Sequence, residues 1–212
     1  MYLFSRRTRL APGNGRAGLE WAVEMTGLAS TITGLPIGLY GQVYSPAYGT
    51  LAWSTFIADL ATLEQAGDAL MTSDEYVAMS DRGAQLTIGG MDDGLTQIVH
   101  GEPDPDREIN YVSVVRAVTA GGNAVRGITV GVEIAQRAEA ATGLPTMFGT
   151  DVTGTYGGVG WLTGYEDAGA VEAAQQKLAA DPGWLEYVDR EAGTAYVEEP
   201  GFTTQLMYRR LV

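Results

Sequence analysis

The chain contains an internal duplication, and this limits the folds that it can adopt. Thr33-Gly34-Leu35-Pro36 returns 109 residues later as Thr142-Gly143-Leu144-Pro145. Other positions return at a spacing of 108 residues: Tyr48/Tyr156, Trp53/Trp161, Asp59/Asp167, Glu64/Glu172, Leu70/Leu178, Asp81/Asp189, Arg82/Arg190 and Gln97/Gln205. A repeat of this length is the size of a small domain. We therefore expect two copies of one module, residues 1–100 and 109–212, joined by a linker over residues 101–108.

The spacing of apolar residues predicts the same order of elements in both copies. Residues 2–10 alternate with a period of two, which indicates a strand, whereas Trp21, Met25 and Leu28 fall on one face of a helix over residues 16–31. Further elements of the first copy are strands 37–44 and 48–54, a helix 55–71, a short helix 73–82, and a strand 95–100 after a Gly/Asp-rich loop. Those of the second are strands 109–120, 146–152, 156–163 and 203–211, and helices 125–141, 166–179 and 182–190.

The order strand, helix, strand, strand, helix, strand is that of a ferredoxin-like βαββαβ module. The predicted fold class is therefore α+β, with two such modules in tandem. Helices cover only one face of a ferredoxin-like sheet, so the opposite face needs a cover. Asn14 and Asn123 are expected to cap the first helix of each module, and the glycines of Gly157-Gly158-Val159-Gly160 to ease a bend or a bulge in a strand.

Composition narrows the classes of partner. The formal net charge of −13 repels phosphate backbones and anionic lipid surfaces, so we expect neither nucleic acid nor membrane partners. The sequence has no cysteine, which excludes disulfides and thiolate metal sites. No apolar run approaches the roughly 20 residues of a membrane span. We expect a cytoplasmic protein that binds no metal, since its acidic clusters read as solvated turns.

The second copy resembles a known family in three places. They are Asp181-Pro182-Gly183-Trp184-Leu185-Glu186-Tyr187, the run from Ala192 to Glu199, which we expect to be extended, and the closing strand with Leu206-Met207-Tyr208-Arg209-Arg210. These segments resemble the dimeric α/β-barrel (ferredoxin-like) superfamily, in its NIPSNAP-like and antibiotic-biosynthesis-monooxygenase-like branches. The resemblance implies two four-stranded sheets packed face to face as an eight-stranded α/β barrel, closed within one chain or between chains. It also implies a pocket for an apolar or aromatic small molecule, in some members without any cofactor.

Candidate substrate-binding residues are aromatic or basic. Tyr40, Trp53, Phe148 and Trp161 lie on middle strands, where alternate side chains could line a pocket or pack the core; Tyr208 closes the last strand. Arg7 and Arg116 occupy the same position in the two first strands. They could bind a carboxylate or an enolate, or form ion pairs with Glu24 and Glu133 of the first helices.

Candidate catalytic residues are those that differ between the copies. His100 is the only histidine and is replaced by Tyr208 in the second copy, while Gln42 is replaced by Asp151. A histidine can act as a general base or as an axial haem ligand, although an exposed strand-end histidine with no role is the simpler interpretation. We expect no cofactor, with haem as the exception to test.

Three functions remain open. The first is a small-molecule-binding barrel protein, either a binding protein or a cofactor-independent monooxygenase or isomerase for an apolar or aromatic substrate. The second is a non-enzymatic structural protein that forms homo-oligomers or docks on a larger complex. The third is a haem protein that uses His100. Polar residues that are the same in both copies are more simply explained by roles in folding. The pairs that differ between the copies, Gln42/Asp151 and His100/Tyr208, favour a functional site.

Overall fold

The structure is a computed structural model that describes residues 1–199 and 201–212. The first repeat contains, in chain order, β1 (Tyr2–Leu10), α1 (Gly15–Thr33), β2 (Gly38–Val43), β3 (Thr50–Ile57), α2 (Leu60–Met71), α3 (Asp74–Ala84) and β4 (Thr87–His100). The second contains β5 (Tyr111–Val118), α4 (Ala124–Thr142), β6 (Thr146–Asp151), β7 (Gly158–Tyr165), α5 (Ala168–Ala180), α6 (Pro182–Ala195) and β8 (Thr204–Arg210).

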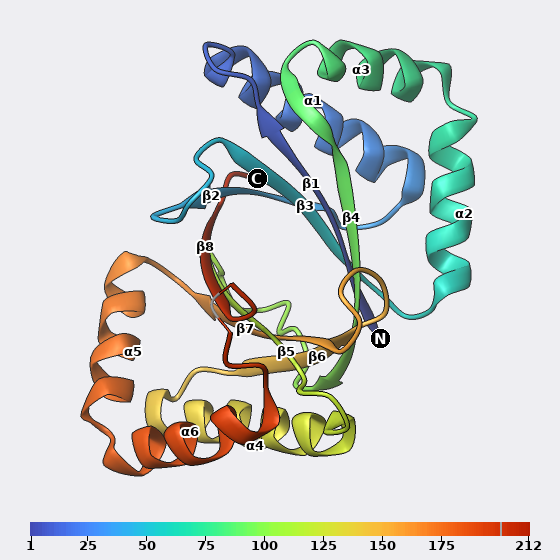
Figure 1. Cartoon of the computed structure of the whole chain (residues 1–212). Helices are drawn as coiled ribbons and strands as arrows, with labels where there is room; N and C mark the ends of the chain where they lie inside the picture. The colour runs from blue at the N-terminus through green and yellow to red at the C-terminus, as the bar shows by residue number, and fades with distance from the viewer. Residues whose placement is uncertain (200) are drawn as a thin grey trace. The chain divides into compact units, whose positions relative to one another are not determined.

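The predicted fold class is confirmed. Over the described residues the protein is an α+β fold whose eight strands hydrogen-bond in the order β1-β3-β2-β8-β5-β7-β6-β4 of a closed barrel (Figure 1). The chain divides into two compact units: unit 1 is Met1–Leu95 with Arg209–Val212, and unit 2 is Thr96–Tyr208. The last strand of each repeat is thus shared between the units. The module boundaries expected from the sequence remain a prediction.

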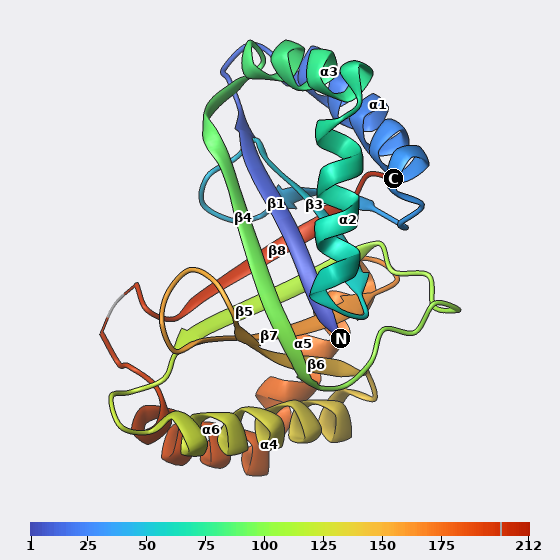
Figure 2. The same ribbon diagram turned by 90° about the vertical axis from the view of Figure 1, so that its right-hand side faces the viewer.

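In unit 1 the three helices cover one face of the sheet. Figures 1 and 2 show α1, α2 and α3 on the same side of β1 and β3. The antiparallel register places Trp53 of β3 opposite Arg6 of β1 and Leu39 of β2. Trp53 and Leu39 belong to the core beneath the helices, where the rings of Trp21 and Trp53 meet edge to face at 5.6 Å. The neighbouring strand residues therefore point to the other side, which we call the helix-free face.

Unit 2 has the same layering. The sheet β5-β7-β6 is antiparallel, and Val115, Trp161 and Phe148 share one row across it. These residues pack in the core under α4 and α6, with Trp161 5.4 Å from the ring of Tyr196. Tyr196 occupies the place against Trp161 that Trp21 has against Trp53, although it comes from the end of α6 and not from the first helix. The two cores are therefore alike in shape but not in sequence.

Side-chain hydrogen bonds determine where several helices begin. Asp59 and Asp167 accept hydrogen bonds from Thr62 N and Ala170 N at the starts of α2 and α5. The helix expected from residue 55 therefore begins at Leu60, because Asp59 caps it and residues 55–57 complete β3. Gly34, with φ at 68°, ends α1 as expected.

The structure corrects three other sequence expectations. Asn14 and Asn123 stand at the N-cap positions, but their side-chain amides donate to Gln85 O and Thr194 O instead of capping the helix. Residues 192–195 continue α6 and are not extended. β4 begins at Thr87, because its Gly/Asp-rich first half pairs as a strand and was not recognised from composition.

No helix in residues 1–199 or 201–212 is long and apolar enough to cross a membrane.

Candidate functional site

The helix-free face of unit 2 carries a buried polar cluster. The Asp151 side chain is only 3% exposed, and its Oδ2 accepts a hydrogen bond from Arg116 Nη2. Its other oxygen, Oδ1, accepts one from Thr96 Oγ1 at 3.0 Å. The three residues come from β6, β5 and β4 respectively. The structure therefore brings two predicted site residues, Asp151 and Arg116, into direct contact.

Glycines in β7 make this contact possible. β7 lies between β5 and β6, and Gly160 is opposite both Arg116 and Gly149. A Cβ atom at Gly158 would lie 2.3 Å from Asp151 Oδ2, so a larger residue there would displace the carboxylate. A Cβ at Gly160 would make only an ordinary van der Waals contact, with Val115 O at 3.5 Å. The register between β5 and β7 runs unbroken to Gly158, so these glycines do not form the bulge that the sequence suggested.

The corresponding cluster in unit 1 is incomplete. Arg7 is opposite Ala52 on the helix-free face, as Arg116 is opposite Gly160. Asp151, however, is replaced by Gln42, whose Nε2 donates to Pro46 O. The Nε of Arg7 is buried and has no hydrogen-bond partner among the described residues. Arg7 and Gln42, two predicted site residues of unit 1, thus lie on the same face without a hydrogen bond between them.

The ion pairs that we expected between strand arginines and first-helix glutamates are absent from the described residues. Arg82 of α3 pairs with Glu24, while Glu133 accepts a hydrogen bond from the Tyr187 hydroxyl. The reason is strand geometry: Arg7 and Arg116 point to the helix-free face, away from the helices. Sequence position alone did not reveal that orientation.

Most of the predicted aromatic wall belongs to the cores. Trp53 Nε1 donates to Thr26 Oγ1 at 2.9 Å, and Trp161 Nε1 donates to Gly131 O at 2.8 Å. Both contacts are with the first helix of the unit, and Phe148 packs beside Trp161 in the same layer. These three side chains lie on the opposite face of the sheets from Arg7 and Arg116.

Two predicted tyrosines are placed differently from the tryptophans. Tyr40 alternates with Leu39 and therefore lies on the helix-free face of unit 1, where burial raises the pKa of its hydroxyl. Tyr208 of β8 is buried in unit 2. Tyr40 thus shares a face with Arg7 and Gln42. From the sequence it was grouped with Trp53, Phe148 and Trp161, which belong to the cores.

His100 is separate from Asp151. A register shift between Ile98 and His100 places His100 opposite Phe148, on the helix-covered side of β6. Its Nε2 is buried, lies 3.7 Å from Glu139 Oε2 and makes no hydrogen bond with a described residue. A haem iron at Nε2 would need open space where this carboxylate of α4 lies, so these surroundings do not fit a haem. His100 and Asp151 do not form one catalytic site in unit 2.

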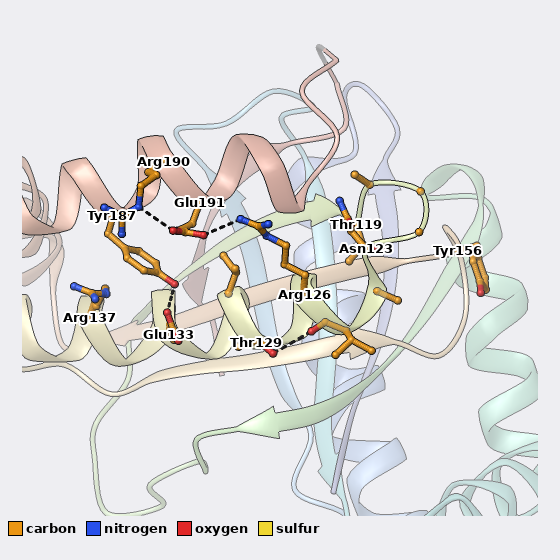
Figure 3. Close-up of a pocket in the computed structure, with 16 residues that line it drawn as sticks. Thr119, Asn123, Arg126, Thr129, Glu133, Arg137, Tyr156, Tyr187, Arg190 and Glu191 are labelled. Carbon is orange, nitrogen blue, oxygen red and sulfur yellow. Dashed lines mark hydrogen bonds and ion pairs between the residues drawn. The ribbon is translucent and has the colours of Figure 1, made fainter.

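A groove between α4 and α6 is a site that sequence reasoning missed. It has a volume of about 1060 Å³ and is lined by both helices, the loop before α4 and Tyr156 (Figure 3). The Tyr187 hydroxyl donates to Glu133, and the Arg137 guanidinium lies 4.0 Å from the centre of the Tyr187 ring. Burial, together with the hydrogen bond to Glu133, raises the pKa of Tyr187 to about 12.

A second set of charges lies next to Tyr187 on α6, where the Arg190 guanidinium is 5.8 Å from the centre of the Tyr187 ring. Glu191 accepts hydrogen bonds from Arg126 Nη2 at 3.0 Å and from Arg190 Nε at 2.8 Å (Figure 3). The hydrogen bond from Arg190, followed by that from Arg126, lowers the pKa of the Glu191 carboxyl. The charges in this groove are therefore largely paired with one another.

The duplication explains why the groove is found in unit 2. Its residues Arg126, Arg137, Tyr187 and Glu191 correspond to Ala17, Leu28, Met79 and Gly83 in the first repeat. In unit 1 the buried indole of Trp21 fills the space against Gly83, and a Cβ on Gly83 would lie 2.1 Å from that ring. In unit 2 the smaller Val130 stands at the position of Trp21. The change from Trp to Val between the repeats was the sequence signal for this groove.

Among the residues that the structure describes, no three His, Asp or Glu side chains gather as a metal site.

Comparison with known proteins gives matches in structure only. No family model matches the sequence, and neither does any curated protein. A protein provisionally named a monooxygenase, from Fusobacterium nucleatum subsp. nucleatum, is similar with a TM-score of 0.70 and 8% identity over 100% of this chain and 92% of its own. An anthrone oxidase-like protein gives a TM-score of 0.69 and 11% identity, with 100% and 91% of the chains covered. A protein provisionally named a chlorite dismutase gives a TM-score of 0.56 and 12% identity, over 100% of this chain and 96% of its own.

These similarities extend over the whole chain, at identities that establish the fold alone. The chain shares with these structures an α+β fold of ferredoxin-like element order with a closed eight-stranded barrel, as the element order and the resemblance carried by Asp181–Tyr187 led us to expect.

Proposed function

We propose, from the dimeric α/β-barrel fold and the polar cluster on a helix-free face, that this chain binds a small apolar or aromatic molecule and acts on it as a cofactor-independent monooxygenase. The observation that carries the proposal is the buried carboxylate of Asp151, which lies with its partners Arg116 and Thr96 on a face that also carries glycine and apolar side chains. A face that served only for packing has no need of a buried carboxylate, whose desolvation is costly.

Apolar side chains and an acceptor lie together in unit 2. Gly160 places no side chain over β7, and Leu162 and Val114 of the same face offer apolar contact. An ionised carboxylate has about four lone-pair positions, of which Thr96 and Arg116 use two. Asp151 therefore retains the capacity to accept a hydrogen bond from a phenolic hydroxyl or a proton from an acidic carbon of the substrate.

The reaction that suits this acceptor converts an activated methylene to a carbonyl. Asp151 takes the proton of the substrate, and the resulting carbanion or enolate supplies the electrons to dioxygen. One oxygen atom enters the product and the other leaves as water, so that R₂CH₂ and O₂ give R₂C=O and H₂O. The similarity to proteins named as a monooxygenase and as anthrone oxidase-like supports this choice over isomerisation.

Oxygen uptake with 1,8-dihydroxyanthrone, in the presence of a metal chelator and without added cofactor, tests the proposal. We expect the wild type to exceed the buffer blank and Asp151→Asn to be slower by about 100-fold, the usual loss when a general base is removed. Asp92→Asn, an exposed strand position, is the matched control and should keep the full rate. A wild-type rate equal to that of the blank would overturn the proposal that the protein oxidises this compound. If the compound did not quench the tryptophan fluorescence of the protein, the proposal that the protein binds it would be overturned.

The groove between α4 and α6 favours a second candidate function, the docking of another protein chain. Tyr156 is 99% exposed and Val125 is 81% exposed at its rim, an arrangement typical of contact surfaces. Sedimentation velocity of the wild type and of Tyr156→Ser separates the possibilities. A wild-type oligomer that Tyr156→Ser dissociates would support docking of a second copy, whereas a monomer at all concentrations would contradict it.

A further inference from the structure

Arg7 of unit 1 is a half-buried cation without a counter-ion among the described residues, and its Nε atom is fully buried. Its Nε has no hydrogen-bond partner, and no described carboxylate pairs with its guanidinium. An arginine cannot lose its charge at any physiological pH, so burial cannot be relieved by deprotonation. A buried N–H donor of a charged group that has no acceptor is unfavourable unless a partner is supplied.

The second repeat provides an internal comparison. There the equivalent arginine, Arg116, is paired with Asp151. In the first repeat Gln42 replaces Asp151, and Thr50 replaces Gly158, the position at which a side chain would collide with the carboxylate. Thr50 also donates its hydroxyl to Ala47 O, so it is held in place. Unit 1 has therefore lost both the anion and the space for it, while keeping the arginine.

We infer that Arg7 binds an anionic group of a small-molecule ligand, and that this group is a carboxylate. The free Nε and an adjacent Nη of a guanidinium form a planar fork that matches two carboxylate oxygens. The apolar and phenolic surroundings on the same face, Ala52 and Tyr40, suit an aromatic body behind that carboxylate. The first unit thus holds an anion-binding position for an aromatic carboxylate, which is additional to the proposed oxidation and does not depend on Asp151.

Arg116 does not compete for this group. Its guanidinium already contacts Asp151, which is itself buried. A ligand carboxylate near Arg116 would be repelled by that aspartate. The duplication therefore yields two arginines at equivalent positions, of which Arg7 alone is available to an anion.

The test compares 1-naphthoate with its neutral analogue 1-naphthamide by isothermal titration calorimetry on the full chain. We expect the wild type to bind 1-naphthoate about 10- to 100-fold more tightly, the usual strength of a hydrogen bond to a charged group. Arg7→Gln should remove this preference and leave the affinity for 1-naphthamide unchanged. Arg9→Gln, which removes an exposed arginine of the same strand, is the matched control and should retain the preference.

A second variant keeps Arg7 and tests the same idea if Arg7→Gln does not fold. Gln42→Asp combined with Thr50→Gly rebuilds the arrangement of Asp151 and Gly158 in unit 1. It should supply Arg7 with an internal anion and abolish the preference for 1-naphthoate. Equal affinities for the two compounds in the wild type, or an unchanged preference in the rebuilt variant, would overturn the inference. Oxidation of the neutral 1,8-dihydroxyanthrone would persist in either case if the proposed function is correct.

Discussion

Single residues decide which of the two repeats has a complete polar pair. Asp151 and Arg116 satisfy each other, and the substitution of one carboxylate by an amide at Gln42 leaves Arg7 unsatisfied. The arginine fork is the same in both strands, so the difference lies entirely in its partners. Duplicated sites diverge in this way because one copy can maintain the fold while the other acquires a ligand.

Asp151→Asn is predicted to destabilise the protein. The amide removes the charge that Arg116 needs, and because the Arg116 side chain is 35% exposed, solvent offsets part of the loss. We expect the free energy of unfolding to fall by about 1–3 kcal/mol. Urea denaturation measures it, with Asp92→Asn as an exposed control that should change it by less than about 0.5 kcal/mol.

Gly158→Ala and Gly160→Ala form a matched pair on one strand. The added methyl group at 158 meets Asp151 Oδ2, whereas at 160 its nearest neighbour is Val115 O at 3.5 Å. Gly158→Ala should therefore lower the free energy of unfolding by about 1–3 kcal/mol more than Gly160→Ala does. Equal thermal midpoints for the two variants would show that the glycine at 158 does not make room for the carboxylate.

At the scale of elements, the contacts between helices were more difficult to predict than the positions of the strands. The alternation in residues 2–10 gave β1 with its correct bounds, whereas the start of α2 was placed too early because the cap at Asp59 was not recognised. The pairing of Arg116 was missed because it depends on the register of β5, β7 and β6, which no local pattern contains. The groove was missed because arginines and glutamates on a helix normally indicate a solvated face.

Tyr187 joins α6 to α4 and makes stability depend on pH. Its pKa is raised from 10.0 to about 12 in the folded protein, so the unfolded chain loses this proton first as the pH rises. The stabilisation is complete below about pH 10 and is lost between about pH 10 and 12. Urea midpoints should therefore fall more steeply over this range for the wild type than for Tyr187→Phe, and parallel curves would contradict the assignment.

At the scale of the whole molecule, the duplication carries the account. The repeat of Thr33-Gly34-Leu35-Pro36 predicted two modules, and the element order predicted that each is ferredoxin-like. The resemblance to barrel proteins implied the closed barrel that the strand order confirms. The ligand could not be predicted in the same way, because the fold is common to proteins with different names and the distinguishing residues are unpaired changes such as Gln42 and Asp151.

Native mass spectrometry of the chain, purified gently from its own cells, tests the central claim that it holds a small acidic molecule at Arg7. The account predicts an adduct of small-molecule mass on the wild type, released on denaturation and detected as an anion with aromatic absorbance. Arg7→Gln should carry much less of it, whereas Arg9→Gln, at an exposed position of the same strand, should carry it undiminished. A wild-type mass equal to that of the bare chain, or the same adduct at the same occupancy on Arg7→Gln, would contradict the claim.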